Sequence, residues 1–267
     1  MKNPTHILRA IRFLIMTGAG LVMIHFLVRV FVADRFIVRG ESMSPTLVDG
    51  KPVYVNKLTY GARIYTSFDF ECPDLHCFRM PGLRKPRCGD VIAFNYPFGR
   101  GQERIQFKIN YVYLKRCIGC PGDSLSIRGG YYINNHIEGG FPAIQGQHMV
   151  ASVPDSLMGY GYGCFPNDTA FSWTLKEFGP VLVPGKGICI KMDPYHARLY
   201  SYVIEYETGS RPSIQDGTVL LENRPAGSYI FRENYYFMAG DNVLNSSDSR
   251  YFGFVPERFI IGRVPVK

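Results

Sequence analysis

The chain opens with its longest apolar run, which is long enough to cross a membrane. Residues 13–33 read FLIMTGAGLVMIHFLVRVFVA, with His25 and Arg29 as the ionisable residues. A helix of about 20 apolar residues spans the hydrocarbon layer of a bilayer. An arginine near the end of such a helix can reach the lipid headgroups. We therefore predict a transmembrane helix over residues 13–33.

The charges before this run predict its orientation. Lys2, Arg9 and Arg12 precede it without an acidic residue among them. Positively charged flanks stay in the cytoplasm, so we expect residues 1–12 there and the chain from Asp34 onward outside. A cleaved secretory signal peptide is the alternative, but its apolar region normally spans about 7 to 15 residues before a small-residue cleavage site. The longer run here favours an uncleaved anchor.

After this run the pattern changes to short apolar stretches bounded by glycine, proline and asparagine. Such stretches predict strands, and the clearest are RFIVRGESM, KPVYVNKLTYG and CGDVIAFNYPFG. The segments YYFMAGDNVLNSSDSRYFGFVP and IIGRVPVK predict a strand, a loop and a strand at the end of the chain. Residues 66–87 form a looser excursion, and residues 124–234 hold only short β-like runs such as YYINN, ICIKM and SYVIEYE. We predict a mainly β protein in which residues 34–123 and 235–267 form a β core and residues 124–234 form an inserted β-rich subdomain.

The strictest alternation lies in ERIQFKINYVYLKRCIGCPGDSLSI, which predicts one long strand broken at Cys-Pro-Gly-Asp. Its odd positions carry the apolar or aromatic residues Ile105, Phe107, Ile109, Tyr111 and Tyr113. Because side chains alternate between faces, Lys115 falls on the apolar face and Arg116 on the polar one. Burial lowers the pKa of a lysine, and a neutral amine can act as a general base. A lysine near a strand end that extends its ammonium to water is the simpler alternative.

Charge and composition narrow the function only slightly. Lys and Arg number 30 against 22 Asp and Glu, which gives a formal net charge of +8. Such a balance is compatible with an anionic membrane surface or with nucleic acid. The chain has no dense lysine and arginine run with interleaved aromatic residues, so we predict no nucleic-acid partner.

Seven cysteines stand at positions 72, 77, 88, 117, 120, 164 and 189, and an odd number cannot all pair within one chain. The spacings Cys72-x4-Cys77 and Cys117-x2-Cys120 could together form a four-thiolate zinc site. Outside the cytoplasm, a local disulfide between Cys72 and Cys77 is the plainer interpretation. We therefore predict no metal site and no cofactor.

The stretch GESMSPTLVDG places Ser42 shortly after the apolar run, among glycine and proline residues. Such a serine is either a turn residue or, beside a base, a nucleophile. No pair of histidine and aspartate stands out as that base, since His25 lies in the apolar run and others stand in undistinguished loops. Lys115 is therefore the candidate base.

Four motifs resemble bacterial signal peptidase I, the leader peptidase family. GESMSPTL is similar to its serine box, GDVIAFNYP to its next strand, YLKRCIGCPGD to its lysine box and GDNVLNSSDSRYFGFVP to its C-terminal box. The motifs occur in the family's order between residue 36 and about residue 256. A single motif would be a weak signal, but the ordered set is specific. The resemblance implies a Ser-Lys dyad in which Ser42 is the nucleophile and Lys115 the general base.

The resemblance also implies roles in the C-terminal box. There Ser246 would position the lysine amine, and Asp248 and Arg250 would form a supporting ion pair. Asp241 and Asn242 would shape the start of the loop. A calcium loop is the alternative for this acidic segment, but counting from Asp241 it lacks the glycine at the sixth position and the glutamate at the twelfth.

Two features of the family are altered here. The backbone N–H of Ser42 matches the family's oxyanion donor, but Gly40 stands where some members carry a second, hydroxyl donor, and Val243 and Leu244 replace a charged pair. The substrate would add as an extended strand beside shallow apolar pockets that accept small residues. The residues that match those pocket positions are Phe36, Val38, Met43, Leu47, Tyr113 and Leu114.

The implied function is a membrane-anchored serine endopeptidase that removes signal peptides from secreted preproteins after Ala-x-Ala-like sites. We expect a single-pass protein of the inner or plasma membrane with its catalytic domain on the outer, extracytoplasmic face, whose partners are preproteins and the bilayer. A related Ser-Lys peptidase that processes itself or one dedicated partner is an alternative. An inactive, anchored β protein that binds extended peptides is another.

Overall fold

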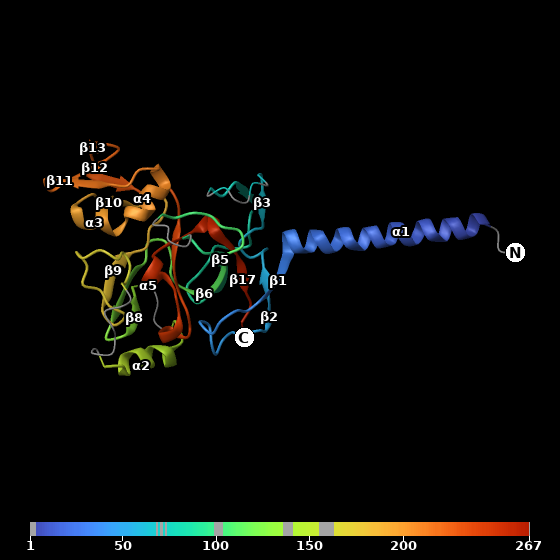
Figure 1. Ribbon diagram of the computed structural model, residues 1–267, viewed down its shortest axis with the longest axis horizontal. Helices are drawn as coiled ribbons and strands as arrows, with labels where there is room; N and C mark the ends of the chain where they lie inside the picture. Colours follow the sequence, from blue (N-terminus) through green and yellow to red (C-terminus); the bar gives the residue numbers. More distant parts are fainter. Residues whose placement is uncertain are drawn as a thin grey trace.

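A long N-terminal helix extends away from a β-rich body in the computed structural model (Figure 1). The structure describes residues 4–67, 69, 72, 74–98, 104–135, 141–154 and 163–266, so that Lys2 lies outside the described residues. Helix α1 (Pro4–Leu27) continues into a π-helical turn, η1 (Val28–Val32). By length and composition, Ile11–Val32 could cross a membrane, and most of its large apolar side chains are exposed. A helix that is apolar all round needs an apolar environment, and no other part of the described chain covers it.

A seven-stranded sheet forms the body next to this helix, with the strand order β1-β2-β17-β5-β6-β15-β16 (Figure 1). All of its pairings are antiparallel. Its strands are β1 (Ala33–Ile37), β2 (Pro52–Asn56), β5 (Val91–Asn95), β6 (Val112–Gly119), β15 (Tyr235–Ala239), β16 (Val255–Pro256) and β17 (Ile260–Val264). Chain segments from both ends of the sequence therefore meet in one sheet, and the prediction of a mainly β fold is confirmed.

Smaller elements surround this sheet. A hairpin of β3 (Arg63–Tyr65) and β4 (Cys77–Arg79) precedes β5, and the short α5 (Ser249–Phe252) with the 3-10 turns η3 (Val243–Asn245) and η4 (Glu257–Phe259) lies near the C-terminus. Between β6 and β15 come β7 (Ser124–Arg128), β8 (Tyr131–Asn134), α2 (Ile144–Ser152), β9 (Phe178–Leu182), β10 (Cys189–Lys191), α3 (Pro194–Leu199), α4 (Ser201–Thr208), β11 (Ser213–Gln215), β12 (Thr218–Leu221), β13 (Arg224–Pro225) and β14 (Ser228–Ile230). The elements from β9 to β14 lie on the side of the body away from α1 (Figure 1).

The prediction that SYVIEYE is β-like is wrong, because this stretch forms α4. The start and stop signals of helices are present around it. Asp193 caps the preceding helix α3 by accepting a hydrogen bond from the N–H of His196, and Pro194 occupies its first turn. Gly209 ends α4 in the left-handed conformation, with φ of 78°. Alternation of aromatic and polar residues over seven positions did not distinguish a strand from a short helix whose buried side is Val203 and Ile204.

The strand that carries Lys115 is shorter than predicted. It begins only at Val112, after a turn at residues 109–110, and Asn95 stabilises this turn by donating hydrogen bonds to the carbonyls of Lys108 and Ile109. Lys115 nevertheless shares a strand face with Tyr113, as the alternation predicts. Arg116 lies on the opposite face from Lys115, where its side chain is buried but contacts polar groups of Gly89 and Asp241. Other parts of the chain cover both faces of β6.

Two apolar clusters occupy these two faces. Tyr113 packs against the larger cluster, which includes Ile92 and Phe94 of β5. Leu114 packs against the smaller cluster, which consists of Val38, Met43, Leu47, Val55, Val91, Ala93, Ile261 and Val264. The smaller cluster therefore anchors the segment after β1 to the sheet.

Candidate active site

Ser42 and Lys115 lie side by side although 73 positions separate them in the sequence. Lys115 Nζ is 2.5 Å from Ser42 Oγ, which is hydrogen-bonding distance. The strand β6 carries the lysine, whose side chain is only 4% exposed, whereas Ser42 lies in the turns after β1 and is partly exposed. The structure thus brings the predicted nucleophile to the predicted base and leaves the serine accessible.

Burial alters the acidity of the lysine. Loss of hydration lowers the pKa of Lys115 to about 8, against the opposing effect of the Asp248 carboxylate and with a smaller contribution from the Arg250 charge. The ring of Tyr113 covers one side, with its centroid 5.3 Å from Nζ. About one tenth of the amine is therefore neutral at pH 7 and about half at pH 8, and a neutral amine can accept the hydroxyl proton.

Asp248 and Arg250 form the predicted ion pair, and both side chains are fully buried. Arg250 Nε lies 2.8 Å from Asp248 Oδ1 and its Nη2 lies 2.9 Å from Oδ2. Burial alone would raise the pKa of the Asp248 carboxyl, but the Arg250 charge and hydrogen bonds outweigh it, so this pKa is lowered. Asp248 also accepts the N–H of Gly240, and Arg250 Nη2 donates to the carbonyl of Val243. The pair therefore organises the loop that faces Lys115.

A second buried ion pair joins the three chain segments that form the site. Asp241, in the C-terminal box, accepts hydrogen bonds from Arg116 Nε at 2.7 Å and Nη2 at 2.6 Å. Thr46, four residues after Ser42, donates its hydroxyl to the same carboxylate. Asn242 continues the contact, because its N–H donates to the carbonyl of Ser42 at 3.1 Å. Sequence reasoning missed Arg116 and Thr46, since neither position shows locally that its partner lies elsewhere in the chain.

Ser246 is buried near Ser42 and Lys115, but its hydroxyl makes no hydrogen bond to the Lys115 amine. The bond to Lys115 that the resemblance implies is therefore not formed in this structure. A Cβ at Gly240 would lie 2.2 Å from Ser246 Oγ and 2.4 Å from the carbonyl oxygen of Ser42. Only glycine fits between these two residues, a requirement that the sequence did not reveal.

The candidate pocket residues divide between the two apolar clusters. Five of them belong to or pack against the smaller cluster beside Ser42, namely Phe36, Val38, Met43, Leu47 and Leu114. Tyr113 instead packs against the larger cluster, on the side of β6 that carries Lys115. The role of these residues in substrate binding stays a prediction.

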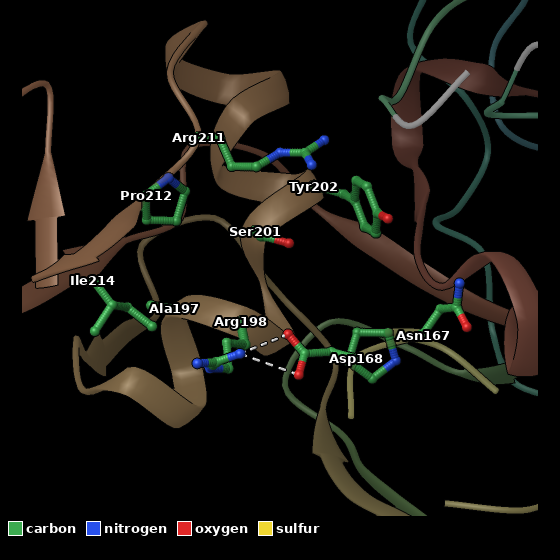
Figure 2. Close-up of a pocket in the computed structure, with 10 residues that line it drawn as sticks. Asn167, Asp168, Ala197, Arg198, Ser201, Tyr202, Arg211, Pro212 and Ile214 are labelled. Atoms are coloured by element: carbon green, nitrogen blue, oxygen red, sulfur yellow. Dashed lines mark hydrogen bonds and ion pairs between the residues drawn. The ribbon is translucent and has the colours of Figure 1, made fainter. Parts of the chain in front are cut away.

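A separate cavity of about 390 Å³ is lined by residues between Pro166 and Ile214 (Figure 2). The ion pair between Arg198 and Asp168 crosses its floor, and Arg211 and Tyr202 stand above it in this view. Its lining shares no residue with the site around Ser42 and Lys115. It is therefore not part of the candidate active site.

Comparison with protein families agrees with this geometry. The family described as signal peptidase, peptidase S26, matches residues 10–151 and 181–267. This match, together with a β core in which a serine contacts a lysine, defines the class of the protein as a serine endopeptidase. The chain belongs to the signal peptidase family, and the resemblance seen in its motifs is confirmed.

Individual relatives cover most of the chain. The signal peptidase I of Buchnera aphidicola subsp. Baizongia pistaciae is 27% identical over 251 residues, which is 91% of this chain and 72% of the relative. That of Helicobacter pylori is 28% identical over 264 residues, which is 96% of this chain and 81% of the relative. A signal peptidase I of known structure from Enterococcus faecalis is 20% identical, with a TM-score of 0.31, and covers 69% of this chain and 100% of its own.

Proposed function

We propose that this chain is a membrane-anchored signal peptidase that removes signal peptides from secreted preproteins through a Ser42 and Lys115 dyad. The observation that carries the proposal is the 2.5 Å contact between Ser42 Oγ and the buried amine of Lys115. Membership in the signal peptidase family supports the substrate class. The contact supports the chemistry, because a serine nucleophile needs a base within hydrogen-bond reach.

The proposed reaction is acyl transfer in two steps. Neutral Lys115 accepts the hydroxyl proton of Ser42 while Oγ attacks the scissile carbonyl, and the proton then passes to the leaving amine. A water molecule, deprotonated by the same amine, hydrolyses the ester and frees Ser42. The backbone N–H of Ser42 is the proposed oxyanion donor. Gly40 supplies no hydroxyl, and its N–H already donates to Asp49 at 2.8 Å, so a second donor must come from another group.

The proposed substrate segment is extended and carries small side chains near the cleaved bond. The apolar residues beside Ser42, among them Phe36, Met43 and Leu114, pack closely and favour small partners. The helix α1 would hold the site at the outer face of the membrane, where a preprotein emerges. The three basic residues before the apolar run support a cytoplasmic N-terminus.

A cleavage assay tests the substrate class. Full-length protein in detergent should cut a preprotein after its Ala-x-Ala site, as the N-terminal sequence of the product would show. Replacing the residue before the bond with tryptophan should lower kcat/KM by about 10-fold or more, since a closely packed apolar site penalises excess volume. A substitution ten residues downstream is the matched control. Cleavage of the chain itself or of no preprotein would favour the alternative functions.

The pH dependence tests the proposed base. We expect kcat/KM to rise with pH and to level off above the pKa of Lys115, about 8. Below this value the protonated ammonium cannot accept the proton of Ser42, and above it the amine is neutral. The profile should be the same for two peptides that differ in ionisable residues away from the bond. Activity that is flat or decreasing across this range would contradict the assignment.

A further inference from the structure

Three cysteine sulfurs meet near the end of the strand that carries Lys115. They belong to Cys88 before β5, Cys117 on β6 and Cys120 after it, and all three lie within 4.8 Å of one another. Cys120 Sγ is 3.5 Å from Cys88 Sγ and 3.9 Å from Cys117 Sγ. Backbone hydrogen bonds keep the segment before β5 next to β6. They run from the N–H of Gly89 to the Cys117 carbonyl and from the N–H of Cys117 to the Asp90 carbonyl.

The spacing of these sulfurs suits a tetrahedral zinc site. With zinc–sulfur bonds of about 2.3 Å, two thiolates of a tetrahedral site lie about 3.8 Å apart. The observed separations of 3.5 and 3.9 Å are close to this value. A disulfide would require about 2.05 Å, and all three cysteines are free.

A buried carboxylate lies against the same cluster. Asp123 Oδ2 is 3.4 Å from Cys88 Sγ, and the residue is 6% exposed. The same oxygen accepts hydrogen bonds from the N–H of Cys120 at 2.8 Å and from Asn134 Nδ2 at 2.9 Å. Donors of this kind orient the ligands of metal sites. A rotation of the carboxylate toward the other two sulfurs would complete four-fold coordination.

We propose that Cys88, Cys117 and Cys120, with Asp123 as the fourth ligand, bind one zinc ion. The ion would join the end of β6 to the turn before β5. Its ligand Cys117 lies two residues after Lys115 in the sequence. Binding would displace the thiol protons, which are released to solvent. The four-thiolate grouping suggested by sequence spacing is wrong, because Cys72 lies with Asp74 and His76 in a different group.

Metal analysis of the full-length protein tests this site without using peptidase activity. Protein purified in detergent under reducing conditions and loaded with zinc should retain one zinc per chain after desalting. Cobalt bound in place of zinc should show the absorption band of charge transfer from thiolate to metal. C88S and C120S should lose both signals, whereas the matched control C189S, an exposed cysteine in the inserted part, should keep them. D123N should weaken zinc affinity by about 10- to 100-fold.

A second measurement uses the wild-type chain alone, in case a cysteine variant does not fold. Zinc should protect the half-buried Cys88 and Cys120 from alkylation, as read by mass spectrometry, while the exposed Cys189 stays reactive. A disulfide between Cys88 and Cys120 in protein isolated without reductant would overturn the proposal. So would substoichiometric zinc, protection at Cys72 instead, or equal zinc binding by C88S and C189S.

Discussion

We expect cleavage to fall by at least about 10³-fold in Ser42→Ala and in Lys115→Met, with the fold kept in both variants. The first substitution removes the attacking oxygen. The second removes the only base that contacts this oxygen in the described structure, while methionine retains most of the apolar stem of lysine. Because the two groups act as one unit, the double variant should be at most slightly slower than either single variant.

The measurement is kcat/KM on a preprotein, with far-UV circular dichroism to verify the fold. Ser44→Ala and Lys51→Met are the matched controls, since one alters a neighbouring serine and the other an exposed lysine just before β2. Both controls should cleave at the wild-type rate. Near-normal cleavage by either dyad variant would refute the assigned chemistry.

Asp248→Ala should destabilise the protein by about 3–5 kcal/mol, because it leaves the fully buried guanidinium of Arg250 without its counter-ion. The lost carboxylate also caps α5 and accepts the N–H of Gly240. The loop beside Lys115 depends on these contacts. Activity should therefore decrease with stability.

Urea denaturation followed by tryptophan or tyrosine fluorescence measures this change in the free energy of unfolding. Asp168→Ala is the matched control, because its partner Arg198 is partly exposed and such a pair contributes only about 0–1 kcal/mol. The double variant Asp248→Leu with Arg250→Met should recover much of the stability, since it leaves no unpaired buried charge. Equal destabilisation by Asp248→Ala and Asp168→Ala would contradict this account.

Local patterns predicted the parts of the fold that depend on neighbouring residues. The apolar run before Asp34 was recognised as a helix and CGDVIAFNYPFG as strand β5, whereas RFIVRGESM is a strand only as far as Ile37 and continues into turns. The error at α4 has a physical cause. A helix of eight residues makes only about two turns, which is too short for its hydrophobic pattern to be distinguished from that of a strand. The prediction of one long strand is wrong at residues 109–110, because a buried asparagine from β5 stabilises a turn there.

By itself the sequence determined the apolar helix, the mainly β character and, through its four ordered motifs, which serine and which lysine are the candidate nucleophile and base. Each of these can be inferred from local composition and from the spacing of residues along the chain. Only the tertiary structure decided the 2.5 Å contact of Ser42 with Lys115, the pairing of Arg116 with Asp241 and the gathering of Cys88 with Cys117 and Cys120. These contacts join residues far apart in the chain, and strand pairing and burial, which no local pattern records, bring them together.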